Sequence, residues 1–251
     1  LRLDRDQMVN ALGIAQSRAA GTMEMVYSLD SNVLGIYACF PGLDGTLAAL
    51  MAQRGFKGIK TGFDGKAGLF KVYFGNDYHR ETLTADLGQR FECTNLSTKL
   101  WPVCGSTFPY IGATLKLVTE HDIRPEDISE VTAHVAGFAE SLCVPLEVRR
   151  KPPSTMDATF SIPYSIAIAA VRRKVTIGDF LLANLGDPAV LEMANKVTPV
   201  HDTSFDHFDE SLRPSSLPRG PQGMVEIRTK DGKVVSQLMD EACGYYTRRE
   251  D

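Results

Sequence analysis

The stretch MVEIRTKDGKVVSQL, at residues 224–238, decides the fold class. Two alternating segments, 224–227 and 234–238, flank an Asp-Gly pair at Asp231 and Gly232. Such a pair between alternating segments predicts a β-hairpin, because both central residues of the tight turn need positive φ. We therefore expect a sheet in the C-terminal half of the chain.

Other elements of the same half extend this pattern. Residues 128–135 alternate like a strand. Residues 211–223 are rich in Pro, Ser and Gly and are expected to form an exposed loop. Apolar spacing predicts helices between these segments, at 106–120, 160–173 (interrupted early by Pro163), 177–185 and 188–196.

The first part of the chain is predicted to be mainly helical. Asp6 is expected to cap a helix that runs to about Ala20 and is closed by Gly21, and a second helix is expected at 44–54. Residues 71–74 have a short β-like pattern, and 80–91 is again predicted to be helical. We predict an α+β fold with three parts: a helical portion at 1–94, a mixed α+β domain at 95–238, and a tail at 239–251.

Composition excludes several classes of protein. The 251 residues carry a formal net charge of -4 with scattered basic residues, so a nucleic-acid surface is not expected. The basic groups at 149–151 and 172–174 are either anion contacts or solvated helix ends. No apolar run has the length of a membrane span, and the first residues lack the apolar segment of a signal peptide. We expect a cytoplasmic or organelle-matrix location. Because the sequence has no initiator Met, we expect a chain cut from something longer, a processed product or a natural subunit.

The side chains that could carry chemistry do not form a familiar cofactor motif. Five cysteines, an odd number without a C-x-x-C pair, indicate free thiols in a reducing compartment; Cys104 is nearest to a reactive setting. His201 and His207 stand among aspartates, which suggests either a metal cluster or, in our preferred interpretation, a polar surface loop. Nucleotide-binding and metalloprotease motifs are absent, so no cofactor and no metal are expected.

Several segments, in order, resemble one known family. They are ALGIAQS at 11–17, GTLAALMAQRGFKG at 45–58, KLWPVC at 99–104, ATFSIPYSIA at 158–167 and VEIRTKDG at 225–232. Together they resemble the MmgE/PrpD family, which includes 2-methylcitrate dehydratase, cis-aconitate decarboxylase and iminodisuccinate epimerase. The resemblance implies a helical portion followed by a smaller, lid-like α+β domain. It also implies a cofactor-free lyase (dehydratase or decarboxylase) or isomerase that acts on a small citrate-like polycarboxylate.

The resemblance also implies candidate site residues. Removal of water or CO2 from such an acid builds negative charge, which a base and fixed cations must accommodate. Lys99 matches the lysine of a family motif and would bind a carboxylate or stabilise that charge. Tyr164 would donate a hydrogen bond or proton, or else be a buried structural residue. Ser106 would bind an anion or simply cap a helix. We expect Lys99, Ser106 and Tyr164 to line one pocket.

Three departures from the family pattern raise an alternative. The resemblance places Leu34 where the family has a lysine, and Tyr37 and Phe108 where it has histidines. Either Tyr37 and Tyr164 now carry the protons, or catalysis is lost. Family members are about twice as long and begin with a helical portion that contributes an Asp and a His to the site. The alternative is therefore a non-catalytic or half-site subunit, completed by a companion chain or by assembly as a homo-oligomer.

Overall fold

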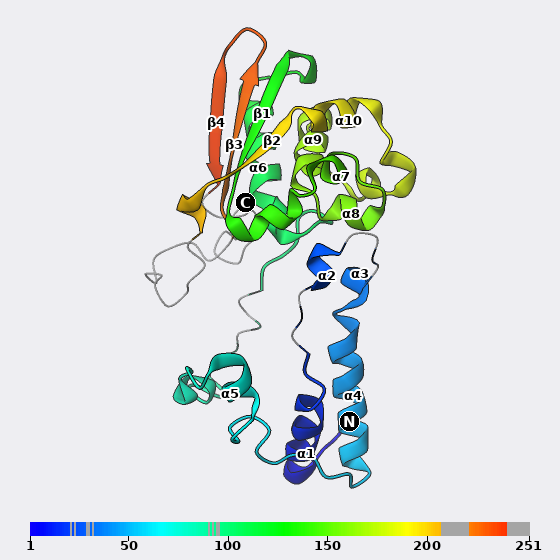
Figure 1. Cartoon of the computed structure of the whole chain (residues 1–251), viewed down its shortest axis with the longest axis vertical. Coiled ribbons are helices and arrows are strands. Elements are labelled where there is room, and N and C mark those ends of the chain that lie inside the picture. The colour runs from blue at the N-terminus through cyan, green and yellow to red at the C-terminus, as the bar shows by residue number, and fades with distance from the viewer. Residues whose placement is uncertain are drawn as a thin grey trace. The chain divides into compact units, whose positions relative to one another are not determined.

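The computed structural model describes residues 1–20, 22, 24–28, 31, 33–89, 91, 93, 96–206 and 221–239. The chain divides into two compact units, which we call unit 1 (residues 1–91) and unit 2 (residues 92–251) (Figure 1). Unit 1 is helical in its described residues, whereas unit 2 combines helices with a four-stranded sheet. The predicted α+β fold class is confirmed. No helix of the described residues has the length and apolar character needed to cross a membrane.

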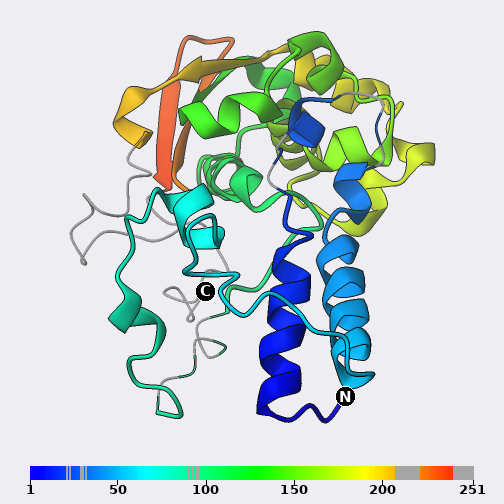
Figure 2. The same ribbon diagram turned by 60° about the horizontal axis from the view of Figure 1, so that its bottom comes forward.

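Unit 1 is built around two long helices. α1 (Arg5–Gln16) and α4 (Cys39–Gln53) lie side by side in both views (Figures 1 and 2). The shorter helical segments are α2 (Glu24–Tyr27), α3 (Val33–Ile36), α5 (Leu69–Phe74) and the 3-10 turn η1 (Arg80–Leu83).

The start of each long helix differs from the prediction. Asp4, not Asp6, caps α1: its side chain accepts from the Gln7 amide, while the Gln7 side chain accepts from the Asp4 amide. This reciprocal capping box satisfies two backbone donors, which a cap at Asp6 would not. α4 begins at Cys39, because Pro41 falls in its first turn, where proline is tolerated.

Two glycines allow the segment around Ile59 to pass α1 with the two backbones in direct contact. A Cβ at Gly13 would lie 2.1 Å from the Ile59 carbonyl oxygen, and one at Gly58 would lie 2.1 Å from the Asn10 carbonyl oxygen. The Gly58 amide donates to Asn10 Oδ1 at 3.1 Å. The core of unit 1 is small and consists of Ala11, Ile14, Ala48 and Ala52.

Two predictions in the rest of unit 1 are wrong. Residues 71–74 belong to helix α5, which ends where Gly75 adopts φ of 60°, and the Phe70 ring stacks on Tyr78 at 4.1 Å. Residues 80–91 form no long helix in their described part, because positive φ at Asp86 and Gly88 turns the chain. A β-like run of four residues is too short to overrule such local contacts.

The sheet of unit 2 has the order β2-β1-β3-β4. β1 (Ile128–Val135) matches its predicted range and pairs in parallel with β2 (Val197–His201). β3 (Gly223–Thr229) runs antiparallel to both β1 and β4 (Val234–Met239). β2 was not predicted, because it is short and contains Pro199, which only an edge strand accommodates readily.

The hairpin was predicted, but its turn is of another type. Gly232 has φ of 90°, whereas Asp231 is not among the described residues with positive φ. The Thr229 amide donates to the Lys233 carbonyl at 2.9 Å, and the Gly232 amide donates to the Thr229 carbonyl at 3.0 Å. A three-residue loop with glycine in the left-handed position thus replaces the expected two-residue turn.

Helices pack against the sheet and against each other. α6 (Phe108–Glu120) contacts β3, β4 and α9 (Ile162–Arg172), and α10 (Pro188–Asn195) contacts α9 (Figure 1). α7 (Leu146–Arg150) and α8 (Thr155–Thr159) precede α9, whose Pro163 is accommodated in the first turn. Within unit 2, the structure describes 3-10 segments at Gly105–Thr107, Pro125–Asp127, Gly137–Leu142, Ile177–Phe180, Leu182–Asn184 and Thr203–Phe205. Residues 177–185 are therefore not one helix.

Candidate functional site

Lys99 lies in the segment that leads into α6. Its ammonium donates to the Val103 carbonyl oxygen at 2.9 Å. The loop is held by the Cys104 amide, which donates to the Thr159 carbonyl at 2.9 Å, and by Trp101, whose ring meets the edge of Phe108 at 5.2 Å. The KLWPVC segment is therefore an ordered turn, and the Lys99 side chain folds back over it.

Ser106 does not cap the helix that follows it. It lies in the 3-10 turn Gly105–Thr107, and the residue before α6 is Thr107. No side chain of the described residues caps the first turn of α6, because the Thr107 hydroxyl donates backward to the Cys104 carbonyl at 2.7 Å. The capping interpretation of Ser106 is wrong, and its anion-binding role stays a prediction.

Tyr164 is buried in unit 2. Only 1% of the residue is exposed, and its ring lies edge-on to Phe180 at 6.4 Å. Burial raises the pKa of Tyr164 to about 12; nearby Arg172 opposes the rise, while Asp179 and Asp187 add to it. The phenol is thus neutral at physiological pH, which suits a hydrogen-bond donor better than a base.

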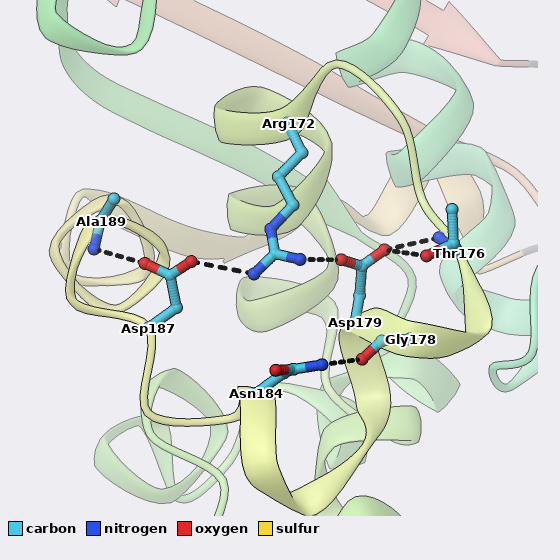
Figure 3. A network of polar contacts seen from close by, with 7 residues as sticks. All are labelled: Arg172, Thr176, Gly178, Asp179, Asn184, Asp187 and Ala189. Carbon is cyan, nitrogen blue, oxygen red and sulfur yellow. Dashed lines mark hydrogen bonds and ion pairs between the residues drawn. The ribbon is translucent and has the colours of Figure 1, made fainter.

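The charges near Tyr164 form a network around Arg172 (Figure 3). The Arg172 guanidinium pairs with the buried Asp179 carboxylate and donates to Asp187 at 2.9 Å. Asp179 also accepts from the Thr176 amide at 2.6 Å, and Asp187 accepts from the Ala189 amide at 2.9 Å. The network joins the end of α9 to the chain that precedes α10.

One arginine in each of the two basic groups of the sequence has partners within the chain. Arg172 is not a solvated helix end: it contacts carboxylates, and these belong to Asp179 and Asp187 of the same chain. Arg149 is buried and donates to the carbonyls of Val144 and Ser141 at 3.1 and 3.0 Å. Sequence reasoning missed this network, although Thr176 and Asp179 have the spacing of a capping box.

The described interactions of Lys99 and of Tyr164 involve different residues. Among the described residues, the Lys99 ammonium bonds only to Val103, whereas the charges that act on Tyr164 come from Arg172, Asp179 and Asp187. The expected pocket shared by Lys99, Ser106 and Tyr164 is therefore not supported by a contact. The site roles of these residues remain predictions.

Tyr37 lies in unit 1, between α3 and α4. It is 46% exposed and lines a cavity of about 510 Å³ together with Arg18 and Asp44. Phe108, at the second position where the family resemblance predicts histidine, is 2% exposed and packs in the core of unit 2. Of the two positions where the resemblance predicts histidine, one thus lines a cavity and the other fills a hydrophobic core.

The cysteines and histidines offer no metal site in the described part of the chain. Cys39, Cys93, Cys104 and Cys143 are free thiols, and burial raises the pKa of Cys143 to about 12. His201 Nε2 lies 2.7 Å from Asp206, but no group of three possible ligands among the described residues is arranged to hold a metal. His207 and Asp209 lie outside the described residues.

Two family models match this chain, one in each of its two units. The sequence is similar to a class of enzymes that includes a lyase, cis-aconitate decarboxylase. The MmgE/PrpD N-terminal domain matches residues 1–81, and the MmgE/PrpD C-terminal domain matches residues 101–251. The chain belongs to the MmgE/PrpD family.

The relatives include two fungal proteins. The chain is 28% identical to cis-aconitate decarboxylase of Aspergillus terreus, over 97% of this chain and 50% of the relative. It is 29% identical to cis-aconitate decarboxylase-like protein oryM of Aspergillus oryzae, over 98% of this chain and 51% of the relative. The chain thus spans about half the length of the curated relatives it matches.

Proposed function

We propose that this chain provides part of a cofactor-free lyase that acts on a small citrate-like polycarboxylate. The observation that carries the proposal is the similarity to cis-aconitate decarboxylases, which extends over 97% of this chain and includes both of its units. A dehydratase or an isomerase of the same substrate class is the nearest variant, because each of these reactions also passes through a state with extra negative charge.

Decarboxylation needs groups that this chain can supply. The bond between carbon and the departing carboxylate breaks, CO2 leaves, and the electron pair remains on the substrate until a proton reaches carbon. Lys99 would bind a remaining carboxylate: its ammonium has three N–H donors, and the described residues use one of them. Ser106 would add a hydroxyl donor from the neighbouring turn.

The two tyrosines would have different parts. With its pKa raised to about 12, Tyr164 would stay protonated and donate a hydrogen bond to the charged intermediate. Tyr37 is half-exposed beside a cavity and would deliver or accept the proton. Tyr37 lies in unit 1, and Lys99 and Tyr164 lie in unit 2.

Turnover of candidate acids tests the proposal. The purified chain is incubated with cis-aconitate, citrate or 2-methylcitrate, and proton NMR follows loss of substrate while released CO2 is trapped. We expect conversion of one acid, and a loss of about tenfold or more in Tyr164→Phe, which removes one hydrogen bond to developing charge. Lys116→Ala, a surface change on α6, is the control. Conversion that is equally fast in Tyr164→Phe contradicts the role of Tyr164.

A second candidate is the half-site subunit, and two observations favour it. Phe108 fills the core at a position where the family resemblance predicts histidine. On α4, Leu43, Leu47 and Leu50 form an exposed apolar stripe, 64%, 44% and 40% exposed. Exposed apolar surface of this kind is typical of an interface.

The oligomeric state distinguishes the two candidates. If the half-site hypothesis holds, the chain alone converts none of the acids, and light scattering at micromolar concentration shows a homo-oligomer or, with a companion chain present, a stable complex. A clean monomer that turns over substrate contradicts it. Leu47→Glu places a charge in the stripe and should dissociate the complex, while Glu24→Gln, an exposed change on α2, should leave it intact.

A further inference from the structure

The sheet of unit 2 has two edges, and the chain protects the one at β2. There, the backbone groups of Val197, Pro199 and His201 point away from β1. The Val197 carbonyl accepts from the Arg150 guanidinium at 3.2 and 2.6 Å, and Pro199 has no N–H to donate. The His201 side chain, at the end of the strand, lies 2.7 Å from the Asp206 carboxylate. Prolines and charged side chains of this kind keep further strands away from a sheet edge.

The β4 edge lacks these protective features. β4 contains no charged residue and no proline, and its register with β3 runs without a bulge. The Thr229 amide donates to the Lys233 carbonyl, so every second residue from Lys233 onward bonds to β3. The backbone groups of Val234, Ser236 and Leu238 therefore point away from the sheet. Their N–H groups have no hydrogen-bond partner among the described residues.

The side chains along this edge are apolar and open to solvent. β4 is the outermost strand of the sheet (Figure 1). Val235 and Met239 join the core of unit 2, whereas Val234 and Leu238, on the opposite face, are 42% and 49% exposed. The Leu238 carbonyl accepts only from the neighbouring Gln237 side chain, at 2.5 Å. The edge thus offers both main-chain donors and apolar surface to another strand.

We propose that β4 pairs in antiparallel fashion with β4 of a second copy of this chain. Ser236 lies at the centre, opposite Ser236 of the second copy, and Val234 lies opposite Leu238 of the second copy. Outward-facing residues that meet in this way exchange both of their main-chain hydrogen bonds. In the pair, an N–H of the second copy replaces the Gln237 side chain at the Leu238 carbonyl. This surface goes beyond the proposed lyase function and does not rest on it.

A second copy fits this edge because the strand is complementary to itself in this register. The two-fold axis through Ser236 repeats the apolar contact between Val234 and Leu238 on both sides, and apolar cross-strand pairs stabilise antiparallel strands. Since β4 carries no charge, two copies of it do not repel each other. Its six residues bury less area than the roughly 1,600 Å² of a standard interface, so we expect a weak dimer.

Hydrogen exchange at micromolar and at millimolar protein concentration tests the pairing, and sedimentation velocity measures the mass. We expect the Ser236 amide to become protected at the higher concentration while the mean mass approaches that of a dimer. The His201 amide also points outward, but on the protected edge, so its exchange rate should not change. A Ser236 amide whose exchange does not depend on concentration overturns the proposal.

Two variants of the edge complete the test. Ser236→Pro removes an outward donor but no bond to β3, and Leu238→Lys places a charge on the edge. Each should raise the dissociation constant of the dimer about tenfold or more, while the amide spectrum stays that of a folded protein. Thr198→Lys, an exposed change on the same face of β2, is the matched control.

Leu47→Glu, on the apolar stripe of α4, separates this dimer from the half-site assembly. It should leave the protection of Ser236 unchanged. Association that Leu47→Glu abolishes, or that both Ser236→Pro and Leu238→Lys leave intact, overturns the β4 pairing. Turnover of cis-aconitate is measured in parallel, so that failure of this interface and failure of the lyase proposal give different results.

Discussion

The two units of the chain bury very different amounts of apolar surface. Unit 2 has one continuous core in which α6, α9 and the sheet contribute residues with almost no exposure. Unit 1 has a core of Ala11, Ile14, Ala48 and Ala52, and its long helices expose leucines and aromatic residues. Because burial of apolar area is the main source of folding free energy, unit 2 carries its own stability and unit 1 depends more on what covers it.

The largest expected effect is that of a substitution that creates a cavity in the core of unit 2. Ile166 on α9 is fully buried, so Ile166→Ala should lower the free energy of unfolding by about 2–5 kcal/mol. Leu47→Ala on α4 removes a residue that is 44% exposed and should cost less than about 1 kcal/mol in the isolated chain. Denaturant unfolding, followed with a spectroscopic probe in each unit, measures the loss of free energy of unfolding in both variants. Equal costs would contradict the difference between the units.

The second expected effect is that of a substitution on α1 in unit 1. A Cβ at Gly13 meets the Ile59 backbone at 2.1 Å, so Gly13→Ala must push the crossing segment away from α1, at about 1–3 kcal/mol. A Cβ at Gly42 on α4 would have no described atom within 4 Å, so Gly42→Ala is the matched control. It should stabilise the helix by about 0.5–1 kcal/mol. Hydrogen exchange of the α1 amides reports both changes.

The ion network of unit 2 should contribute less than its core. Asp179→Ala removes the acceptor of Arg172 and of the Thr176 amide, and should cost about 1–3 kcal/mol. Asp187→Ala removes a more exposed partner and should cost less. Melting temperatures of the two variants give the order. Tyr164 fluorescence should change more in Asp179→Ala, and no difference between the variants would argue against a buried network.

The smallest expected effect is a pH dependence at the sheet edge. The hydrogen bond to Asp206 raises the pKa of His201, with Glu140 and Asp202 acting in the same direction and partial desolvation opposing it. A raised folded-state pKa means that the contribution to stability is complete below the ordinary histidine pKa of about 6.5. It is lost as pH rises through the higher folded-state value.

The Gly137 amide gives a direct probe of this contact. It donates to Asp206 Oδ1 at 2.7 Å, on the carboxylate that also holds His201. Its NMR signal should shift with the His201 titration, and Asp206→Asn should bring the His201 pKa back toward its ordinary value. His121→Gln is the control. A His201 pKa that Asp206→Asn leaves unchanged would exclude the assigned partner.

The elements that the sequence predicts correctly are those that depend on residues close together in the chain. The strand 128–135, the helix of α9 and the hairpin around Gly232 follow from alternation, spacing and a glycine that the turn requires. The family was also recognisable, since its motifs are local and ordered. Segments 71–74 and 80–91 were predicted wrongly because positive φ at nearby residues decides where those turns fall.

Contacts between residues far apart in the sequence could not be predicted from such local patterns. Arg172 finds Asp187 fifteen residues later, and β2 becomes a strand only because β1 offers an edge for parallel pairing. For the candidate site, the motifs predict that Lys99 and Tyr164 share a pocket, and this stays a prediction. The hydrogen bond of Lys99 to Val103 and the charges around Tyr164 are local features that do not test it.

The most direct test of the lyase proposal is binding of cis-aconitate to the chain and to Lys99→Ala. Isothermal titration measures the affinity, and the melting temperature of each protein checks that the fold is intact. The account predicts that Lys99→Ala weakens binding about tenfold or more, as expected for loss of a charged hydrogen bond, with a nearly unchanged melting temperature. Equal affinity in the two proteins would contradict it.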